Sequence, residues 1–119
     1  MSRAVDGSKR KNHRKKILKL AKGYWGRRST NFKTAKDAVA KSLTYAYRDR
    51  RDRKGDFRRI WIIRINAACR ELGISYSKFI AGLDKAGIAI NRKALAYLAT
   101  EDKAAFQAIA EKAKTALGV

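Results

Sequence analysis

The sequence predicts an all-α fold in which a long basic helical N-terminal extension precedes a small C-terminal helical domain. Proline is absent from all 119 residues, so helices can run without a breaker. Alanine, lysine, arginine and leucine, which favour helices, recur along the whole chain. No segment alternates apolar and polar residues for long enough to indicate a strand.

Two helices are predicted in the first part of the chain. The first covers residues 8–22 and stops at Gly23, because glycine readily adopts the left-handed conformation that ends helices. Thr30 or Asn31 caps the second helix, since both side chains accept hydrogen bonds from a helix N-terminus. This second helix continues to about Leu72 and is the longest element expected.

Three shorter helices are predicted in the remainder. Ser75 caps one that ends near Gly87, and Asn91 caps another that runs through Leu98. Thr100 caps the last helix, which continues towards the C-terminus.

The last helix is predicted to begin with an acidic first turn. Glu101 and Asp102 follow the Thr100 cap, where the helix dipole favours negative charge. Apolar residues concentrate in the second half of the chain. We expect the short helices to pack on the end of the long one, around Trp61 and Ile65.

Positive charge is concentrated in the first half of the chain. Residues 1–59 carry 21 Lys and Arg against 5 Asp and Glu, a net charge of +16, whereas residues 60–119 carry 9 against 5, a net charge of +4. Like charges at this density repel and oppose compaction, so a polyanionic partner is expected, with nucleic acid as the leading candidate. The pattern predicts a basic extension over residues 1–58 and a small globular domain over residues 59–119.

The most basic segment covers residues 48–59. Successive residues of a helix are about 100° apart, so these bases point in nearly every direction. A helix charged all round has no face for a protein core and is either a solvated spacer or surrounded by a partner. Arginine forks across phosphate oxygens, which favours nucleic acid. The bases of this segment are Arg48, Arg50, Arg51, Arg53, Lys54, Arg58 and Arg59.

One glycine interrupts this basic segment. Gly55 costs about 1 kcal/mol relative to Ala inside a helix. The sequence leaves open whether the long helix continues through it.

A second group of candidate RNA contacts covers the first helix and the turn after it. Aromatic and guanidinium planes stack on unpaired bases, and glycine lets a backbone come close to RNA. Packing of the two aromatics against a neighbouring helix is an equal alternative. The residues of this group are Lys9, Arg10, Lys11, His13, Arg14, Lys15, Lys16, Lys19, Lys22, Gly23, Tyr24, Trp25, Arg27 and Arg28.

A third group lies in the second half of the chain. Small polar and basic groups around a helix turn hold phosphates, and Arg92 and Lys93 add to such a surface. Ordinary surface and capping roles explain the same residues equally well. The group consists of Arg64, Asn66, Arg70, Ser75, Tyr76, Ser77 and Lys78.

Catalysis, metal binding and cofactor binding have no support in the sequence. One histidine and one cysteine cannot supply a metal cluster. No phosphate-cradling glycine loop and no nucleophile–base pair is present, so we expect no enzyme. Cys69 is expected to be a small core residue. The apolar runs are too short for a secretory signal or a membrane span, so no membrane partner is expected.

Five short segments in a fixed order identify a family resemblance. They are HRKKILK at residues 13–19, AKGYWG at 21–26, YAYRDRR at 45–51, WI at 61–62 followed by RINAA at 64–68, and ISYSKFI at 74–80. Together they resemble the bacterial large-subunit ribosomal protein family numbered twenty in its series. The resemblance covers nearly the whole chain from about Lys9 onward.

The resemblance implies an extension threaded into large-subunit ribosomal RNA and a helical domain docked on the RNA surface. It implies a role early in subunit assembly, neighbouring large-subunit ribosomal proteins as partners, no part in peptide-bond chemistry and a location in the cytoplasm. In several bacteria, members of this family also repress translation of their own messenger RNA, which adds that RNA as an expected partner. No homo-oligomer is expected.

The sequence therefore predicts a structural constituent of the large ribosomal subunit that binds 23S-type ribosomal RNA directly and supports early assembly. The alternative is a DNA-compacting, histone-like protein, which net charge alone does not exclude. Without RNA we expect the extension to be largely disordered, because it has little core to offset the entropy of ordering.

Overall fold

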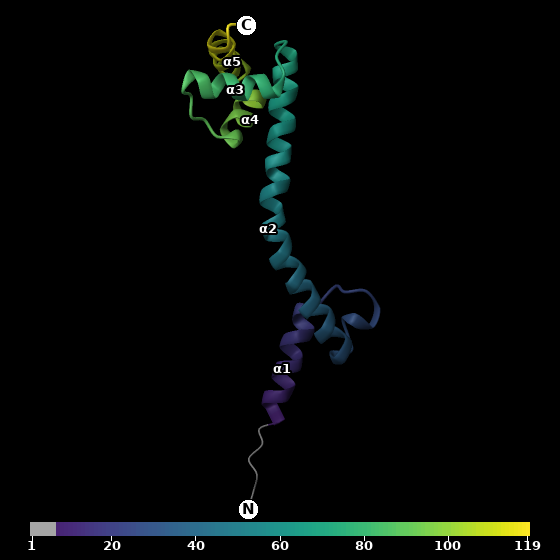
Figure 1. Ribbon diagram of the computed structural model, residues 1–119. Coiled ribbons are helices and arrows are strands. Elements are labelled where there is room, and N and C mark those ends of the chain that lie inside the picture. Colours follow the sequence, from purple (N-terminus) through teal and green to yellow (C-terminus); the bar gives the residue numbers. More distant parts are fainter. Residues whose placement is uncertain (1–6) are drawn as a thin grey trace, which may run out of the picture. The chain divides into compact units, whose positions relative to one another are not determined.

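Figure 1 shows a computed structural model of the chain, which describes residues 7–119. Within this range no strand is present, and the all-α prediction is confirmed. The first six residues of the predicted extension lie outside the described part. In chain order the helices are α1 (Gly7–Leu20), the short 3₁₀ helix η1 (Gly26–Arg28), α2 (Phe32–Glu71), α3 (Tyr76–Ala86), α4 (Arg92–Glu101) and α5 (Lys103–Leu117).

Contacts between residues divide the chain into two compact units, Met1–Arg51 and Asp52–Val119. α2 contributes residues to both. Each unit has its own cluster of buried apolar side chains. The functional division between residues 58 and 59 stays a prediction.

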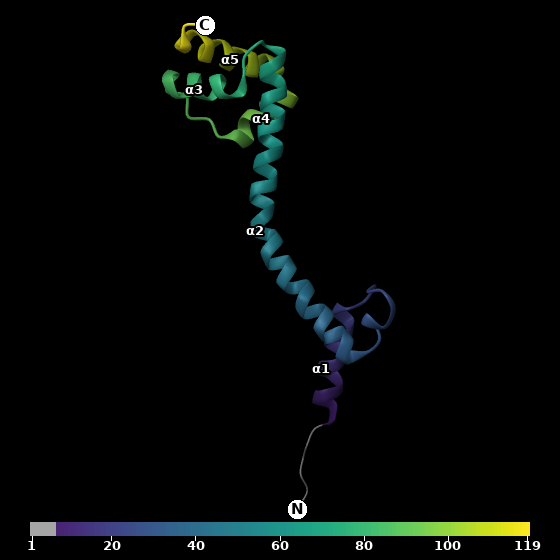
Figure 2. The ribbon, with the colours of Figure 1, turned by 45° about the vertical axis from the view of Figure 1, so that its right-hand side comes forward.

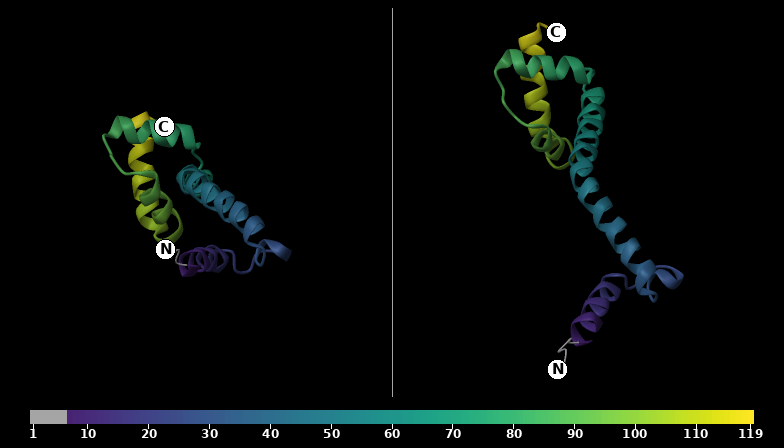
Figure 3. Two further views of the ribbon diagram at one scale, coloured as in Figure 1. Left: turned by 90° about the horizontal axis from the view of Figure 1, so that it is seen from below. Right: turned by 60° about the horizontal axis from the view of Figure 1, so that its bottom comes forward.

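The core of the first unit is small. α1 ends at Leu20, two residues before the predicted end, and Gly23 follows with a φ of 86°. Tyr24 then donates its N–H to the carbonyl of Ala21 at 3.1 Å, which turns the chain back towards α2. Figure 3 shows the loop that leads from α1 through η1 into α2. The core consists of Ala21, Ala35 and Val39, with Ile17, Leu18 and Tyr24 packed against it.

α2 runs without a break from Phe32 to Glu71. It follows Asn31, whose carbonyl accepts the N–H of Ala35 at 2.8 Å. Gly55 lies within the helix, and a Cβ built there would meet nothing within 4 Å. The long helix of the prediction is therefore confirmed, and it continues through Gly55.

The second unit combines the C-terminal part of α2 with α3, α4 and α5. Figure 2 shows α3 and α5 side by side, and α4 also contacts α5. The ring centroids of Phe79 and Phe106 are 5.3 Å apart. Trp61 packs against the buried cluster, as predicted. That cluster consists of Ile65, Cys69, Ile74, Phe79, Leu83, Leu95, Ala96, Ala99, Phe106, Ala110 and Ala113.

α3 and α5 approach closely at one glycine. A Cβ built on Gly82 would lie 2.6 Å from the carbonyl oxygen of Ala113 and 2.9 Å from its Cβ. Both residues are buried in the second unit. A residue without a side chain is therefore needed at position 82 for the two helices to pack at this distance.

Two of the three predicted caps of the short helices are confirmed. The Ser75 hydroxyl accepts the N–H of Lys78 at 3.4 Å, and the Asn91 side chain accepts the N–H of Ala94 at 2.8 Å. Gly87 ends α3 with a φ of 70°, the left-handed conformation expected of it.

The prediction that Thr100 caps the last helix is wrong. α4 continues to Glu101, and the Thr100 hydroxyl donates to the carbonyls of Ala96 and Tyr97 within it. Asp102 is the N-cap of α5 instead, because its carboxylate accepts the N–H of Ala105 at 3.1 Å. Glu101 and Asp102 therefore do not form the first turn of α5.

Two lysines of α5 contact the C-terminal end of α2. Lys114 donates from Nζ to the carbonyl of Leu72 at 2.6 Å. Nζ of Lys103 lies 3.8 Å from the carboxylate of Glu71. Cations are favoured at this end of a helix, where carbonyls lack partners within the helix.

Replacing Gly82 with alanine is expected to destabilise the second unit by about 1–3 kcal/mol, because the new methyl group overlaps the backbone of Ala113. Gly55→Ala is the matched control, because the new methyl group there lies in open space and replaces a poor helix former. The free energy of unfolding of this variant is expected to stay unchanged or to rise by up to about 1 kcal/mol. Urea unfolding of the full chain measures both. Equal stability of the two variants would contradict the close packing at Gly82.

The Cys69 thiol is expected to react slowly with a thiol reagent at pH 8 and rapidly once urea unfolds the second unit. The side chain is buried, and burial raises its pKa from 9.0 to about 11. Because the pKa is raised, the thiol's contribution to stability is fully present below pH 9 and is lost as the pH rises through about 11. Rapid reaction of the native chain would contradict the burial of Cys69.

Candidate nucleic-acid interface

The basic side chains of α1 all lie at the surface. No residue of α1 is buried. The guanidinium of Arg14 lies 5.6 Å from the ring centroid of Phe32, and the His13 ring meets the same ring edge-on at 6.1 Å. His13 is thus part of an aromatic contact between α1 and the start of α2. The exposed bases of this region are Lys9, Arg10, Lys11, Arg14, Lys15, Lys16, Lys19 and Lys22.

The two aromatics between the glycines have different environments. Trp25 is 88% exposed, whereas Tyr24 is half-buried and packs against the core of the first unit. Gly23 and Gly26 both have positive φ, at 86° and 61°. The two neighbouring rings therefore lie in different surroundings. Tyr24 packs against the core, whereas the ring of Trp25 is accessible at the surface. Arg27 and Arg28 are exposed in η1.

The middle of α2 has no buried face. Every residue from 47 to 60 is exposed, although the segment covers almost four helical turns. Its seven Lys and Arg outnumber its three Asp. Nε of Arg48 pairs with Asp49 at 2.9 Å, and the Arg59 guanidinium lies 3.4 Å from Asp56. These side chains are 60–81% exposed, so such pairs contribute little to stability.

Two tyrosine rings of α2 make cation–π contacts with Arg48 and Arg51 of this segment and with Lys41 before it. The guanidinium of Arg51 lies 3.7 Å from the ring centroid of Tyr47. Lys41 and Arg48 lie 5.1 and 4.7 Å from the centroid of Tyr45. Cation–π contacts of this kind orient long side chains without neutralising their charge.

The third predicted group remains at the surface of the second unit. Asn66 and Tyr76 are half-buried, and Ser75 uses its hydroxyl to cap α3. The exposed residues of the group are Arg64, Arg70, Ser75, Ser77 and Lys78.

Arg92 joins this group through a side-chain hydrogen bond. Its Nε donates to the phenol oxygen of Tyr76 at 2.8 Å. Arg92 also lines a hollow of about 260 Å³ together with Arg58, Trp61, Asn91 and Lys93. Arg58, Arg92 and Lys93 were predicted from the sequence as candidate RNA contacts. Trp61 and Asn91 were not, because Trp61 was assigned to the core and Asn91 to a helix cap.

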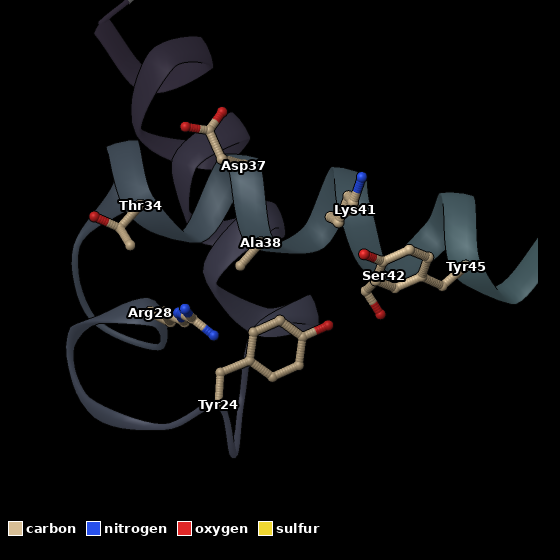
Figure 4. A pocket seen from close by; sticks show the side chains of 8 residues that line it. All are labelled: Tyr24, Arg28, Thr34, Asp37, Ala38, Lys41, Ser42 and Tyr45. Carbon is tan, nitrogen blue, oxygen red and sulfur yellow. The ribbon is translucent and has the colours of Figure 1, made fainter.

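A second hollow, of about 610 Å³, lies in the first unit and was not predicted from the sequence. The signal was the spacing of Thr34, Ala38, Lys41 and Tyr45, which recur every three or four residues on one face of α2. Figure 4 shows the side chains that line it. They are Tyr24, Arg28, Thr34, Asp37, Ala38, Lys41, Ser42 and Tyr45. We call it the Tyr24 hollow.

The chemistry of these surfaces is that of anion binding and stacking. Among residues 7–119, no group of three or more His, Cys, Asp or Glu could hold a metal ion. None of the described helices is long and apolar enough to cross a membrane. What the described chain offers is guanidinium and ammonium groups, exposed aromatic rings and small hydroxyls.

Comparison with known proteins identifies the family. The family model for ribosomal protein L20 matches residues 3–109. The large ribosomal subunit protein bL20 of Treponema denticola is 58% identical over all 119 residues of both chains. The bL20 proteins of Acetivibrio thermocellus and Brachyspira hyodysenteriae are 58% and 60% identical, over 98% and 97% of this chain and 100% and 98% of their own. The chain belongs to the ribosomal protein L20 family.

Proposed function

We propose that this chain binds large-subunit ribosomal RNA of the 23S type directly and supports early assembly of the subunit. Its family makes it a structural constituent of the large ribosomal subunit, in the cytoplasm, rather than an enzyme.

One observation carries the proposal: residues 47–60 of α2 are exposed on every side and strongly basic. A helix of a folded domain normally buries one apolar stripe. This segment has none, and its positive charges repel one another. Phosphates on several sides of the helix would neutralise them and would replace the missing core.

The proposed phosphate contacts extend beyond this segment. Guanidinium groups bind phosphate oxygens with two parallel hydrogen bonds, and ammonium groups bind them as point charges. Trp25, which is 88% exposed, stacks on an unpaired base. The proposed RNA-binding residues of the basic half are Lys9, Arg10, Lys11, His13, Arg14, Lys15, Lys16, Lys19, Lys22, Gly23, Tyr24, Trp25, Arg27, Arg28, Arg48, Arg50, Arg51, Arg53, Lys54, Arg58 and Arg59.

The second half of the chain would fix the register on folded RNA. Its net charge is low, so shape and a few polar contacts have to supply the recognition. In this proposal residues 1–58 penetrate the RNA and residues 59–119 bind its surface. The proposed contacts of the second half are Arg64, Asn66, Arg70, Ser75, Tyr76, Ser77 and Lys78.

Neighbouring large-subunit proteins are further expected partners. Binding to its own messenger RNA and the absence of a homo-oligomer stay predictions from the resemblance. The resemblance assigns binding of the messenger RNA to the domain from about Arg59 onward.

Replacing Arg50, Arg51 and Arg53 with glutamine is expected to weaken binding to a large-subunit ribosomal RNA transcript. Each lost phosphate contact makes the plot of log affinity against log salt shallower by about 0.7–0.9, so the slope should fall by about 2–3. The matched control replaces Lys33, Lys85 and Lys112 with glutamine, which removes the same charge from exposed positions outside the proposed RNA contacts. A slope that is equal in both triple variants would contradict phosphate contact by the arginines.

The alternative function, DNA compaction, is tested by competition. The full chain is expected to bind folded ribosomal RNA in preference to duplex DNA at equal nucleotide concentration and fixed salt, because exposed aromatics stack on unpaired bases that a duplex lacks. Filter binding with labelled RNA and unlabelled competitor measures the preference. A preference for DNA would overturn the proposed function.

A further inference from the structure

The Tyr24 hollow differs from the exposed basic surfaces because it has walls. The loop after α1 supplies Tyr24 and Arg28, and α2 supplies the opposite side. At about 610 Å³ it falls within the roughly 300–1,000 Å³ of pockets that take small organic groups. It therefore has room for a group larger than a single phosphate.

The floor of the hollow is small and the facing ring is aromatic. Ala38 is half-buried and Ser42 is exposed, and neither side chain extends far from α2. Figure 4 shows the Tyr24 ring beside them, with its phenol oxygen directed towards Ser42. The core contacts of Tyr24 fix this ring, so a flat π face is available at low entropic cost.

Cations lie around the hollow, and their positions differ. In Figure 4 the Arg28 guanidinium is directed towards the Tyr24 ring, whereas the Lys41 ammonium and the Asp37 carboxylate point away from it. The Tyr45 ring holds Lys41 through a contact of 5.1 Å. The hollow thus combines an aromatic wall, hydroxyls and positive charge at its edge.

We propose that the Tyr24 hollow takes one unpaired nucleotide of the bound RNA, with the base stacked on Tyr24 and the adjoining phosphate held by Arg28. The inference rests on the proposed function and names a subsite within it. Stacking tolerates any base, so no sequence preference is implied. Bases in a helix are stacked on one another, which restricts the hollow to nucleotides in loops, bulges or ends.

The test uses substitutions that fill the hollow without changing the charge of the chain. Binding of the full chain is measured for Ala38→Leu and for the matched control Ala40→Leu, which adds the same side chain at an exposed position of α2 outside the hollow. Two RNA probes of equal nucleotide number are used, a hairpin with an unpaired loop and a fully paired duplex. Ser42→Leu is a second variant that fills the hollow from another position.

Ala38→Leu and Ser42→Leu are expected to bind the hairpin at least about fivefold more weakly than the unsubstituted chain, the lower end of the effect of losing one stacked base. Binding to the duplex, and the salt dependence on either probe, should stay unchanged. Ala40→Leu should match the unsubstituted chain on both probes. Retained duplex binding shows that each variant still forms its basic surface.

Two outcomes would overturn the subsite. One is unchanged hairpin affinity in both hollow-filling variants, and the other is an equal loss on hairpin and duplex. Either result would leave the proposed function intact if binding remained strong and salt-dependent. Weak, salt-independent binding of the unsubstituted chain to both probes would instead contradict the proposed function and the subsite together.

Discussion

The structure depends on a helix that gains nothing from burial over residues 47–60 of α2. In folded proteins most helical stability comes from packing an apolar face, and this segment has no such face. Local ion pairs such as Arg48 with Asp49 contribute at most about 1 kcal/mol each when exposed. In the proposed function, RNA that surrounds the helix would supply the missing stabilisation and would couple binding to the folding of this segment.

The two units use small residues and aromatics in different ways. In the second unit, Gly82 lets α3 approach α5, and Phe79 and Phe106 fill the core. The first unit buries little more than alanine and valine side chains. Its aromatic residues instead remain wholly or partly accessible, as Trp25 shows at 88% exposure. The second unit thus buries two aromatic rings in its core, whereas the first leaves its rings wholly or partly accessible.

The sequence predicted those features that local chemistry decides. The caps at Ser75 and Asn91 and the long basic helix follow from side chains within a few residues of the feature, whereas the continuity of that helix through Gly55 was left open. The start of α5 did not follow, because Thr100 and Asp102 are both good caps and the burial of Ala99 extends α4 past the first of them. The Tyr24 hollow also escaped prediction, since it exists only where the loop folds back on α2. The RNA-contacting residues themselves remain predictions.

The bond from Lys114 to the carbonyl of Leu72 joins residues that are 42 positions apart. Gly82 and Ala113 are likewise far apart in the chain. During synthesis from the N-terminus, the last turns of α5 emerge after all of the basic half has been made. The core of the second unit therefore cannot close until the last turns of α5 have been made. For that interval the apolar side chains of the second unit remain open, next in sequence to a basic half whose net charge of +16 the folding of that unit does not neutralise.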